Sequence, residues 1–137
     1  MKKLTKLILI LTIIGVLLSG CSSTKLMDSF DKDTVEASAK QTVEYLNSED
    51  YDSVVAMFND DLKEQLTSAD LKSGADSTFK DPGAFKEYKS VTAIGKKIKG
   101  TDEDAAVAVV VAQYENQKVI YTISFNTDMK IIGIFMK

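Results

Sequence analysis

Histidine, arginine and tryptophan are absent from the 137 residues, which contain a single cysteine and a single proline. Without histidine, the chain cannot form a Ser–His or Cys–His catalytic pair or a histidine metal site. Without arginine, it lacks the bidentate clamp that holds carboxylates and phosphates. The 17 lysines and 20 acidic residues give a net charge of -3. Because nucleic-acid affinity depends on neutralising phosphates, we expect no nucleic-acid partner.

The first twenty residues have the pattern of a secretory leader. Three lysines lie within the first six residues, and a twelve-residue apolar run covers 7–18. That run is too short to span ~30 Å of hydrocarbon as a stable helix. The four residues Leu18-Ser19-Gly20-Cys21 resemble the lipobox of bacterial lipoprotein precursors, which reads aliphatic, small, small, cysteine. The resemblance implies a signal peptide over 1–20, cleavage before Cys21, and attachment to the extracytoplasmic face of the cell membrane.

A lone cysteine cannot form an intrachain disulfide, so another role is expected for Cys21 in an exported protein. The thiol can accept a diacylglycerol, which carries acyl chains such as palmitate, and each buried methylene contributes ~0.8 kcal/mol. The alternative is an ordinary buried thiol. With the lipid interpretation, residues 21–32 form a lipidated tether and 33–137 form one domain. Loss of three leader lysines leaves 14 lysines against 20 acids, a net charge of -6.

Helical patterns occupy the first half of this domain. Asp33 to Glu36 has capping-box spacing, which predicts that a helix begins there. Val35, Ala39, Val43 and Leu46 then recur at helical spacing and form one apolar stripe. Three shorter helical segments follow over 51–58, 59–66 and 67–79, with Asn59 and Thr67 as candidate caps. The sequence Asp81-Pro82-Gly83 ends the helical part and turns the chain.

Strand patterns occupy the second half, over 85–99, 105–114, 118–126 and 131–136. The second of these is apolar almost throughout, which is typical of a strand covered on both faces. A two-residue loop at 116–117 would place Tyr121 opposite Ala112. A similar loop at 127–128 would place Tyr121 opposite Ile134. A loop of one more residue would reverse the two faces.

The predicted register gathers one apolar and aromatic face, which only the helices can cover. Its members are Ala108, Val110, Ala112, Tyr114, Val119, Tyr121, Ile123, Phe125, Ile132, Ile134 and Met136. The predicted fold class is therefore α+β, with N-terminal helices packed on a curved antiparallel sheet. This order of elements resembles the cystatin-like architecture of nuclear transport factor 2-like proteins.

The segment from Tyr45 to Phe58, YLNSEDYDSVVAMF, resembles the opening of an uncharacterised domain family found on bacterial lipoproteins. The step Gly83-Ala84-Phe85-Lys86 matches the Gly-x-Phe-Lys entry into that family's first long strand. The resemblance covers 35–137 and carries no catalytic signature. Related folds hold small apolar ligands between helices and sheet, some are isomerases or dehydratases, and domains of this kind sometimes accompany larger hydrolases.

Two phenols, Tyr114 and Tyr121, lie on the predicted core face with Phe125 nearby. Because a buried phenol needs a hydrogen-bond partner or a polar cavity, these three residues form a candidate ligand pocket. The alternative is that both hydroxyls reach solvent or backbone at the end of the sheet. The small residues Ala108 and Ala112 leave room either for close helix packing or for a cavity. An isomerase would need an acid on this face, and the predicted face has none.

Two acidic runs, Asp60-Asp61 and Asp102-Glu103-Asp104, supply oxygen ligands of the kind that calcium prefers. Neither run has calcium-loop spacing, and helix caps and a hairpin turn account for both, so no metal or other cofactor is expected. Five lysines crowd the first strand, where they either contact anionic lipid or protect an edge strand from aggregation. They are Lys86, Lys89, Lys96, Lys97 and Lys99.

The sequence therefore predicts a lipid-anchored, non-enzymatic domain on the outer face of the cell membrane. Its expected partner is a small apolar ligand or another envelope protein. One alternative is a small isomerase- or dehydratase-like enzyme with a Tyr/Asp pocket. Another is an accessory domain that acts with a separate hydrolase.

Overall fold

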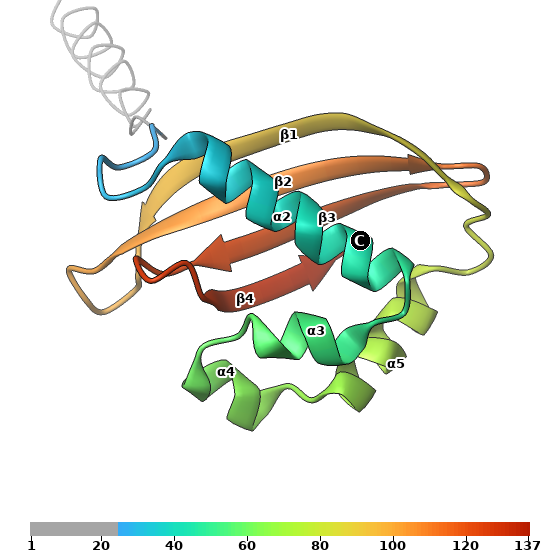
Figure 1. The fold of residues 1–137 in the computed structure, drawn as a ribbon, viewed down its shortest axis with the longest axis horizontal. Helices are drawn as coiled ribbons and strands as arrows, with labels where there is room; N and C mark the ends of the chain where they lie inside the picture. Colours follow the sequence, from blue (N-terminus) through green and yellow to red (C-terminus); the bar gives the residue numbers. More distant parts are fainter. Residues whose placement is uncertain (1–24) are drawn as a thin grey trace, which may run out of the picture.

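Helices precede strands throughout the part of the chain that the computed structural model describes, residues 25–137. The predicted signal peptide, the lipobox and Cys21 lie outside these residues. The predicted α+β class is confirmed, and the arrangement is consistent with a nuclear transport factor 2-like fold (Figure 1). The elements are α2 (Lys32–Asn47), α3 (Tyr51–Ala56), α4 (Asp60–Gln65), α5 (Ser68–Thr78), β1 (Phe85–Lys97), β2 (Asp104–Tyr114), β3 (Lys118–Phe125) and β4 (Ile131–Met136).

The helices begin at short polar caps, as the sequence predicts. Asn59 caps α4, and Thr67 caps α5 in a capping box with Asp70. The predicted start of α2 at Asp33 is wrong by two residues. The Asp31 side chain caps this helix and accepts a hydrogen bond from the Thr34 amide at 2.8 Å, so that the first turn starts at Lys32.

The four strands form an antiparallel meander in the order β1-β2-β3-β4. Tyr121 pairs with Val110 on one side and with Met136 on the other, so the predicted partners Ala112 and Ile134 are wrong. The β2–β3 turn lies one residue earlier than predicted, at 115–116, because the Tyr114 amide bonds the Gln117 carbonyl at 2.8 Å. Both register errors are two residues, and an even shift leaves every side chain of β3 on its predicted face.

A register shift between Ser124 and Phe125 changes the start of β4. It places Phe125 opposite Ile131, which is fully buried, whereas Ile132 is only half-buried. The predicted core position Ile132 is therefore wrong, and Ile131 takes its place. A bulge of this kind inserts one residue on one strand and reverses the alternation locally.

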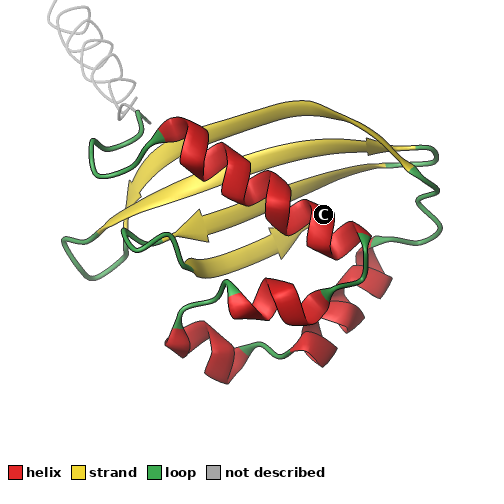
Figure 2. Ribbon diagram, in the orientation of Figure 1, coloured by secondary structure: helices red, strands yellow, loops and turns green. Residues whose placement is uncertain are grey.

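Helix α2 lies across one face of the sheet, as Figure 2 shows, and packs on β1, β2 and β3. Its predicted stripe, Val35, Ala39, Val43 and Leu46, is buried. Ala108 and Ala112 of β2 are fully buried in the same core cluster. Their small side chains therefore serve close packing in the core.

Helices α3, α4 and α5 extend the core beyond β4, the strand at one edge of the sheet (Figure 1). Helix α3 packs on α2 and α5, and α4 and α5 pack on β4. The segment between α3 and α4 pairs with the start of β4. There the Asn59 amide bonds the Ile131 carbonyl at 2.9 Å, and the Ile131 amide bonds the Met57 carbonyl at 2.8 Å.

The segment before α2 is packed against the domain. Phe30 is buried, and Leu26 and Met27 contact the core cluster, so the core also includes residues before Val35, where the predicted apolar stripe begins. Gly95 of β1 makes room for this segment, because a Cβ there would lie 2.5 Å from the Lys25 carbonyl oxygen. Among the described residues, no helix has the length and apolar content needed to cross a membrane.

No helix of residues 25–137 covers the second face of the sheet (Figure 2). Val109 and Val111 of β2 are half-buried there, and Phe135 of β4 is 60% exposed. The prediction that β2 is covered on both faces is therefore wrong. The lysine-rich β1 is an edge strand, where Lys97 pairs with Asp104 at 2.5 Å.

Candidate functional site

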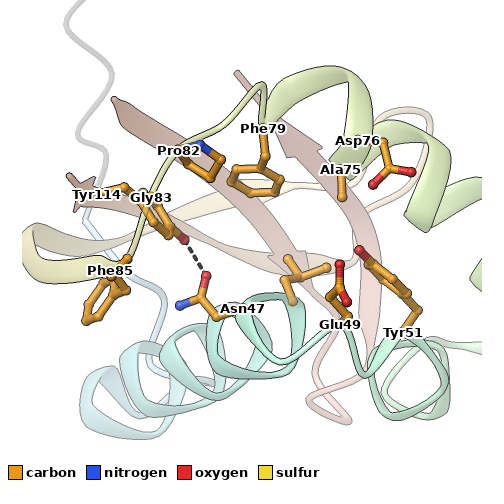
Figure 3. A pocket seen from close by; sticks show the side chains of 12 residues that line it. Asn47, Glu49, Tyr51, Ala75, Asp76, Phe79, Pro82, Gly83, Phe85 and Tyr114 are labelled. Atoms are coloured by element: carbon orange, nitrogen blue, oxygen red, sulfur yellow. Dashed lines mark hydrogen bonds between the residues drawn. The ribbon is translucent and has the colours of Figure 1, made fainter. Parts of the chain in front are cut away.

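A cavity of about 340 Å³ opens where the C-terminal end of α2 meets the end of α5 and the start of β1. Figure 3 shows its aromatic rings and polar side chains facing a common space. We call this cavity the end pocket. It is lined by Leu46, Asn47, Glu49, Tyr51, Ala75, Asp76, Phe79, Pro82, Gly83, Ala84, Phe85 and Tyr114.

Hydrogen bonds hold the α5–β1 loop, which forms one rim of the end pocket, against the β2–β3 turn. The amides of Glu115 and Asn116 donate to the carbonyls of Ala84 and Pro82, at 3.0 and 2.8 Å. The side chains of Asn116 and Gln117 donate to the carbonyls of Asp81 and Thr78, each at 3.0 Å. Four bonds between two connections fix the width of the opening.

Gly83 sits where this loop passes closest to the turn. Its φ is +75°, and a Cβ would lie 2.6 Å from the Cβ of Glu115. Both the backbone conformation and the close approach therefore require glycine. The glycine of the Gly-x-Phe-Lys step thus shapes the rim of the end pocket.

Hydrogen bonds connect two phenols and one side-chain amide at the inner side of the end pocket. The Tyr114 hydroxyl donates to Oδ1 of Asn47, and the hydroxyls of Tyr114 and Tyr121 lie 2.6 Å apart. Because a phenol has one proton, Tyr121 is the donor to Tyr114. The chain of hydrogen bonds therefore runs from the fully buried Tyr121 through Tyr114 to Asn47 at the exposed end of α2.

Burial raises the pKa of both phenols. For Tyr121 the hydrogen bond that it donates to Tyr114 raises the pKa further, while for Tyr114 the bonds with Tyr121 and Asn47 partly oppose the rise. Neighbouring Tyr88 also has its pKa raised, to about 12, chiefly by burial and then by Glu44. All three phenols are neutral near pH 7 and act as hydrogen-bond donors and acceptors there.

Two carboxylates and the phenol of Tyr51 form the opposite side of the end pocket. Figure 3 shows the side chains of Glu49, Tyr51 and Asp76 converging there. Burial raises the pKa of Tyr51, and the carboxylates of Glu49 and Asp76 raise it further, while Lys72 acts in the opposite direction. The Lys72 amino group bonds Asp76 Oδ2 at 2.9 Å.

Glu49 occupies a backbone position that favours glycine. Its φ is 57°, directly after the end of α2. The Asp50 amide bonds the Tyr45 carbonyl at 2.9 Å, and the Glu49 amide bonds the Leu46 carbonyl at 3.1 Å. These two bonds are those of a Schellman motif, in which the left-handed residue is usually glycine. The turn directs the Glu49 side chain to the end pocket.

Comparison with known proteins identifies the family of this chain. A family model described as "Protein of unknown function (DUF3887)" matches residues 39–134, most of the chain. The chain belongs to the DUF3887 family. It is also similar to the protein in an NMR structure from Ruminococcus gnavus ATCC 29149, with 29% sequence identity and a TM-score of 0.69. That similarity covers 82% of this chain and 96% of the other, and no curated protein matches the chain.

The DUF3887 fold separates the three residues of the predicted pocket. Tyr114 lines the end pocket, whereas Tyr121 is fully buried behind it and reaches it only through the Tyr114 hydroxyl. Phe125 pairs with Ala106 at the far end of β3 and does not line this cavity.

The carboxylates of the end pocket were not predicted from the sequence. The predicted sheet face contains no acid, but Glu49 and Asp76 come from the helical half of the DUF3887 domain. The motif that carries the family resemblance contains Asn47, Glu49 and Tyr51, three residues that line the end pocket. Only the fold brings these residues to Asp76 and Tyr114. Within residues 25–137, no group of three acidic or cysteine side chains could hold a metal ion.

Proposed function

We propose that this DUF3887 protein is a non-enzymatic, lipid-anchored domain that binds a small, largely apolar ligand in the end pocket. The observation that carries the proposal is an aromatic-walled cavity with a few converging polar groups. Small-molecule sites in proteins commonly have this composition and a volume of roughly 300–1,000 Å³. The cavity of about 340 Å³ suits a small ligand.

The rings of Phe79 and Phe85 supply the apolar contact. Each lies at an edge-on angle to Tyr114, with ring centroids 5.8 and 5.7 Å from it. Aromatic groups in such arrangements form stiff walls that do not collapse into the space beside them. Tyr114 and Asn47 then offer hydroxyl and amide groups that orient one or two polar atoms of the ligand.

The phenols support binding rather than proton abstraction. Their raised pKa values keep them protonated near neutral pH, so they donate hydrogen bonds but do not act as bases. We therefore assign the end pocket to recognition.

The anchor would place the end pocket away from the membrane. Lys25 lies against Gly95, four residues after Cys21, and four residues reach at most about 14 Å. The end pocket lies at the other end of α2, whose 16 residues span ~24 Å. A ligand in the surrounding medium would thus have free access. The cone between helices and sheet is the place where nuclear transport factor 2-like folds hold ligands.

A thermal-shift screen against extracts of the producing cell's envelope tests ligand binding. Binding raises the melting temperature by mass action, by an amount that grows with ligand concentration. Ala84→Trp should fill the mouth of the end pocket and abolish the rise, whereas Ser90→Trp, on the open face of β1, should retain it. Equal responses from both variants, or no stabilising fraction, would shift the assignment to an envelope protein partner.

Cell fractionation tests the anchor. The Cys21→Ser variant should leave the membrane fraction, because it lacks the thiol that accepts lipid. If wild type and variant both remain in the membrane fraction, lipid on Cys21 is not the anchor.

A further inference from the structure

We propose that the end pocket selects an organic cation, an ammonium group attached to a compact apolar body. The inference rests on the proposed function and names the chemical class of its ligand. It follows from the charge of the lining, the positions of the carboxylates and the aromatic walls between them.

The lining has charge of one sign only. Glu49 and Asp76 are its only carboxylates, and it contains no lysine. Two lysines close in sequence to lining residues have acidic partners: Lys72 pairs with Asp76 at 2.9 Å, and Lys86 pairs with Glu115 at 3.5 Å. Lys80, which follows Phe79, is not part of the lining. The Glu49 carboxylate forms no hydrogen bond or ion pair with any of residues 25–137, so it is available to a ligand.

The two carboxylates act on the same point of the end pocket. Both raise the pKa of the Tyr51 phenol, so the Tyr51 hydroxyl lies within the field of each. Figure 3 shows the three side chains facing one another from α3, α5 and the turn after α2. An ammonium group placed there would meet the Glu49 carboxylate, the Asp76 carboxylate that Lys72 already pairs, and one neutral phenol oxygen that can accept a hydrogen bond.

The remaining wall suits the rest of such a ligand. Phe79, Phe85 and Tyr114 line the space next to this acidic group. Aromatic faces attract cations and also contact apolar groups, so they favour a cation with an apolar body over a small hydrated ion. An anionic ligand would instead face repulsion from the Glu49 carboxylate, which forms no ion pair with residues 25–137.

Three matched probes test this selectivity: 3-phenylpropan-1-amine, which is a cation at neutral pH, 3-phenylpropan-1-ol, which is neutral, and 3-phenylpropionate, an anion. Their affinities are measured by isothermal titration calorimetry on the full chain in a neutral detergent. The amine should bind about fivefold or more tightly than the alcohol, because one unit charge at roughly 4 Å in water has that effect. The carboxylate probe should bind most weakly. The amine's advantage should decrease as salt increases.

Charge variants assign the selectivity to the end pocket. Glu49→Gln and Asp76→Asn should each weaken amine binding about fivefold and leave alcohol binding unchanged. Lys72→Met should strengthen amine binding, because it frees the Asp76 carboxylate, and a purely structural role of these residues would not produce that gain. Asp60→Asn and Lys63→Met, on α4 outside the end pocket, are the matched controls and should change neither affinity.

The outcomes separate this inference from the proposed function. If the alcohol and the amine bind equally and Ala84→Trp abolishes both, the pocket binds ligands but does not select cations. If the amine preference persists in Glu49→Gln and Asp76→Asn, the selectivity arises elsewhere and the inference is wrong. If Ala84→Trp leaves every probe's affinity unchanged, the end pocket is not the binding site and both proposals fail.

Discussion

Tyr114 and Glu49 line the end pocket, and Tyr121 lies buried behind it. Tyr121 is fully buried, and the Tyr114 hydroxyl is the one partner that its hydroxyl has among the described residues. Glu49 holds a left-handed backbone conformation that disfavours side chains. The energetic consequences of these positions can be measured one residue at a time.

The two phenols should differ in their effect on stability. Tyr121→Phe removes one buried hydrogen bond but leaves the Tyr114–Asn47 bond, so it should lower the free energy of unfolding by about 1 kcal/mol. Tyr114→Phe leaves the buried Tyr121 hydroxyl without a partner, so it should cost about 2 kcal/mol. Urea unfolding of both variants measures the difference. The half-buried Tyr45 forms no side-chain hydrogen bond with a described residue, and Tyr45→Phe is the control. The reverse order would contradict the central place of the Tyr114 hydroxyl between Tyr121 and Asn47.

Glycine at position 49 should stabilise the fold. Glu49→Gly relieves the left-handed strain at the end of α2 and should raise the free energy of unfolding by about 0.5–1 kcal/mol. Glu49→Ala keeps the strain and should not produce this gain. Thermal melts compare the three proteins. A melting temperature of the glycine variant at or below that of wild type would show that the Glu49 side chain itself stabilises the turn.

At the scale of helices, aspartates connect helix stability to pH. Hydrogen bonds from the Thr34 side chain and amide lower the pKa of Asp31 below its ordinary value of 3.8, at the start of α2. Hydrogen bonds with the Thr67 amide and side chain lower the pKa of Asp70 in the first turn of α5. Because both folded-state pKa values lie below the unfolded ones, their stabilisation is complete above about pH 4 and is lost as the pH falls through the folded values.

The protein should therefore unfold at a lower urea concentration near pH 3 than near pH 6. The Asp31→Asn/Asp70→Asn double variant should show a smaller decrease, because asparagine can cap a helix without titrating. Asp28→Asn is a suitable control, since the Asp28 carboxylate forms no hydrogen bond with a described residue. An unchanged decrease in the double variant would show that these two caps do not carry the pH dependence.

The segment before α2 is connected to the sheet through Gly95. A Cβ at this position would meet backbone, the Lys25 carbonyl at 2.5 Å and the Met27 amide at 3.1 Å, so Gly95→Ala should displace the segment. We expect a loss of about 1–3 kcal/mol in the free energy of unfolding. The matched control is Gly133→Ala on β4, where the nearest atom would lie at 3.9 Å. In a chain beginning at Asp28, Gly95→Ala should have no such effect. A persistent effect there would place its cause within the sheet.

The element boundaries were predictable from local signals, and the register was not. The alternation of β3 and the caps Asn59 and Thr67 follow from short-range chemistry, and the structure confirms them. The position of the β2–β3 turn depends on tertiary bonds, such as those between the α5–β1 loop and this turn. The predicted faces of β3 are correct despite the wrong register, because both register shifts are even.

At the scale of the whole molecule, the end pocket is assembled from residues that no single pattern joins. Tyr114 was predictable as a polar group on an apolar face. Glu49 and Asp76 are 27 positions apart in helical sequence, where acidic residues are typical of exposed surface and gave no signal of their own. Their convergence with Tyr114 depends on the packing of α5 against α3 and of α2 against the sheet.

An NMR titration of the ¹⁵N-labelled chain with the neutral probe 3-phenylpropan-1-ol tests the central claim, binding in the end pocket, most directly. Backbone amide signals report where a weak ligand binds, whatever its charge preference. If the ligand binds in the end pocket, the amide signals of Asn47, Glu49 and Ala84 should show saturable chemical-shift changes. The signals of Val109 and Phe135, on the open sheet face, should stay unchanged. Shifts concentrated at Val109 and Phe135, or no saturable shift around Ala84, would contradict binding in the end pocket.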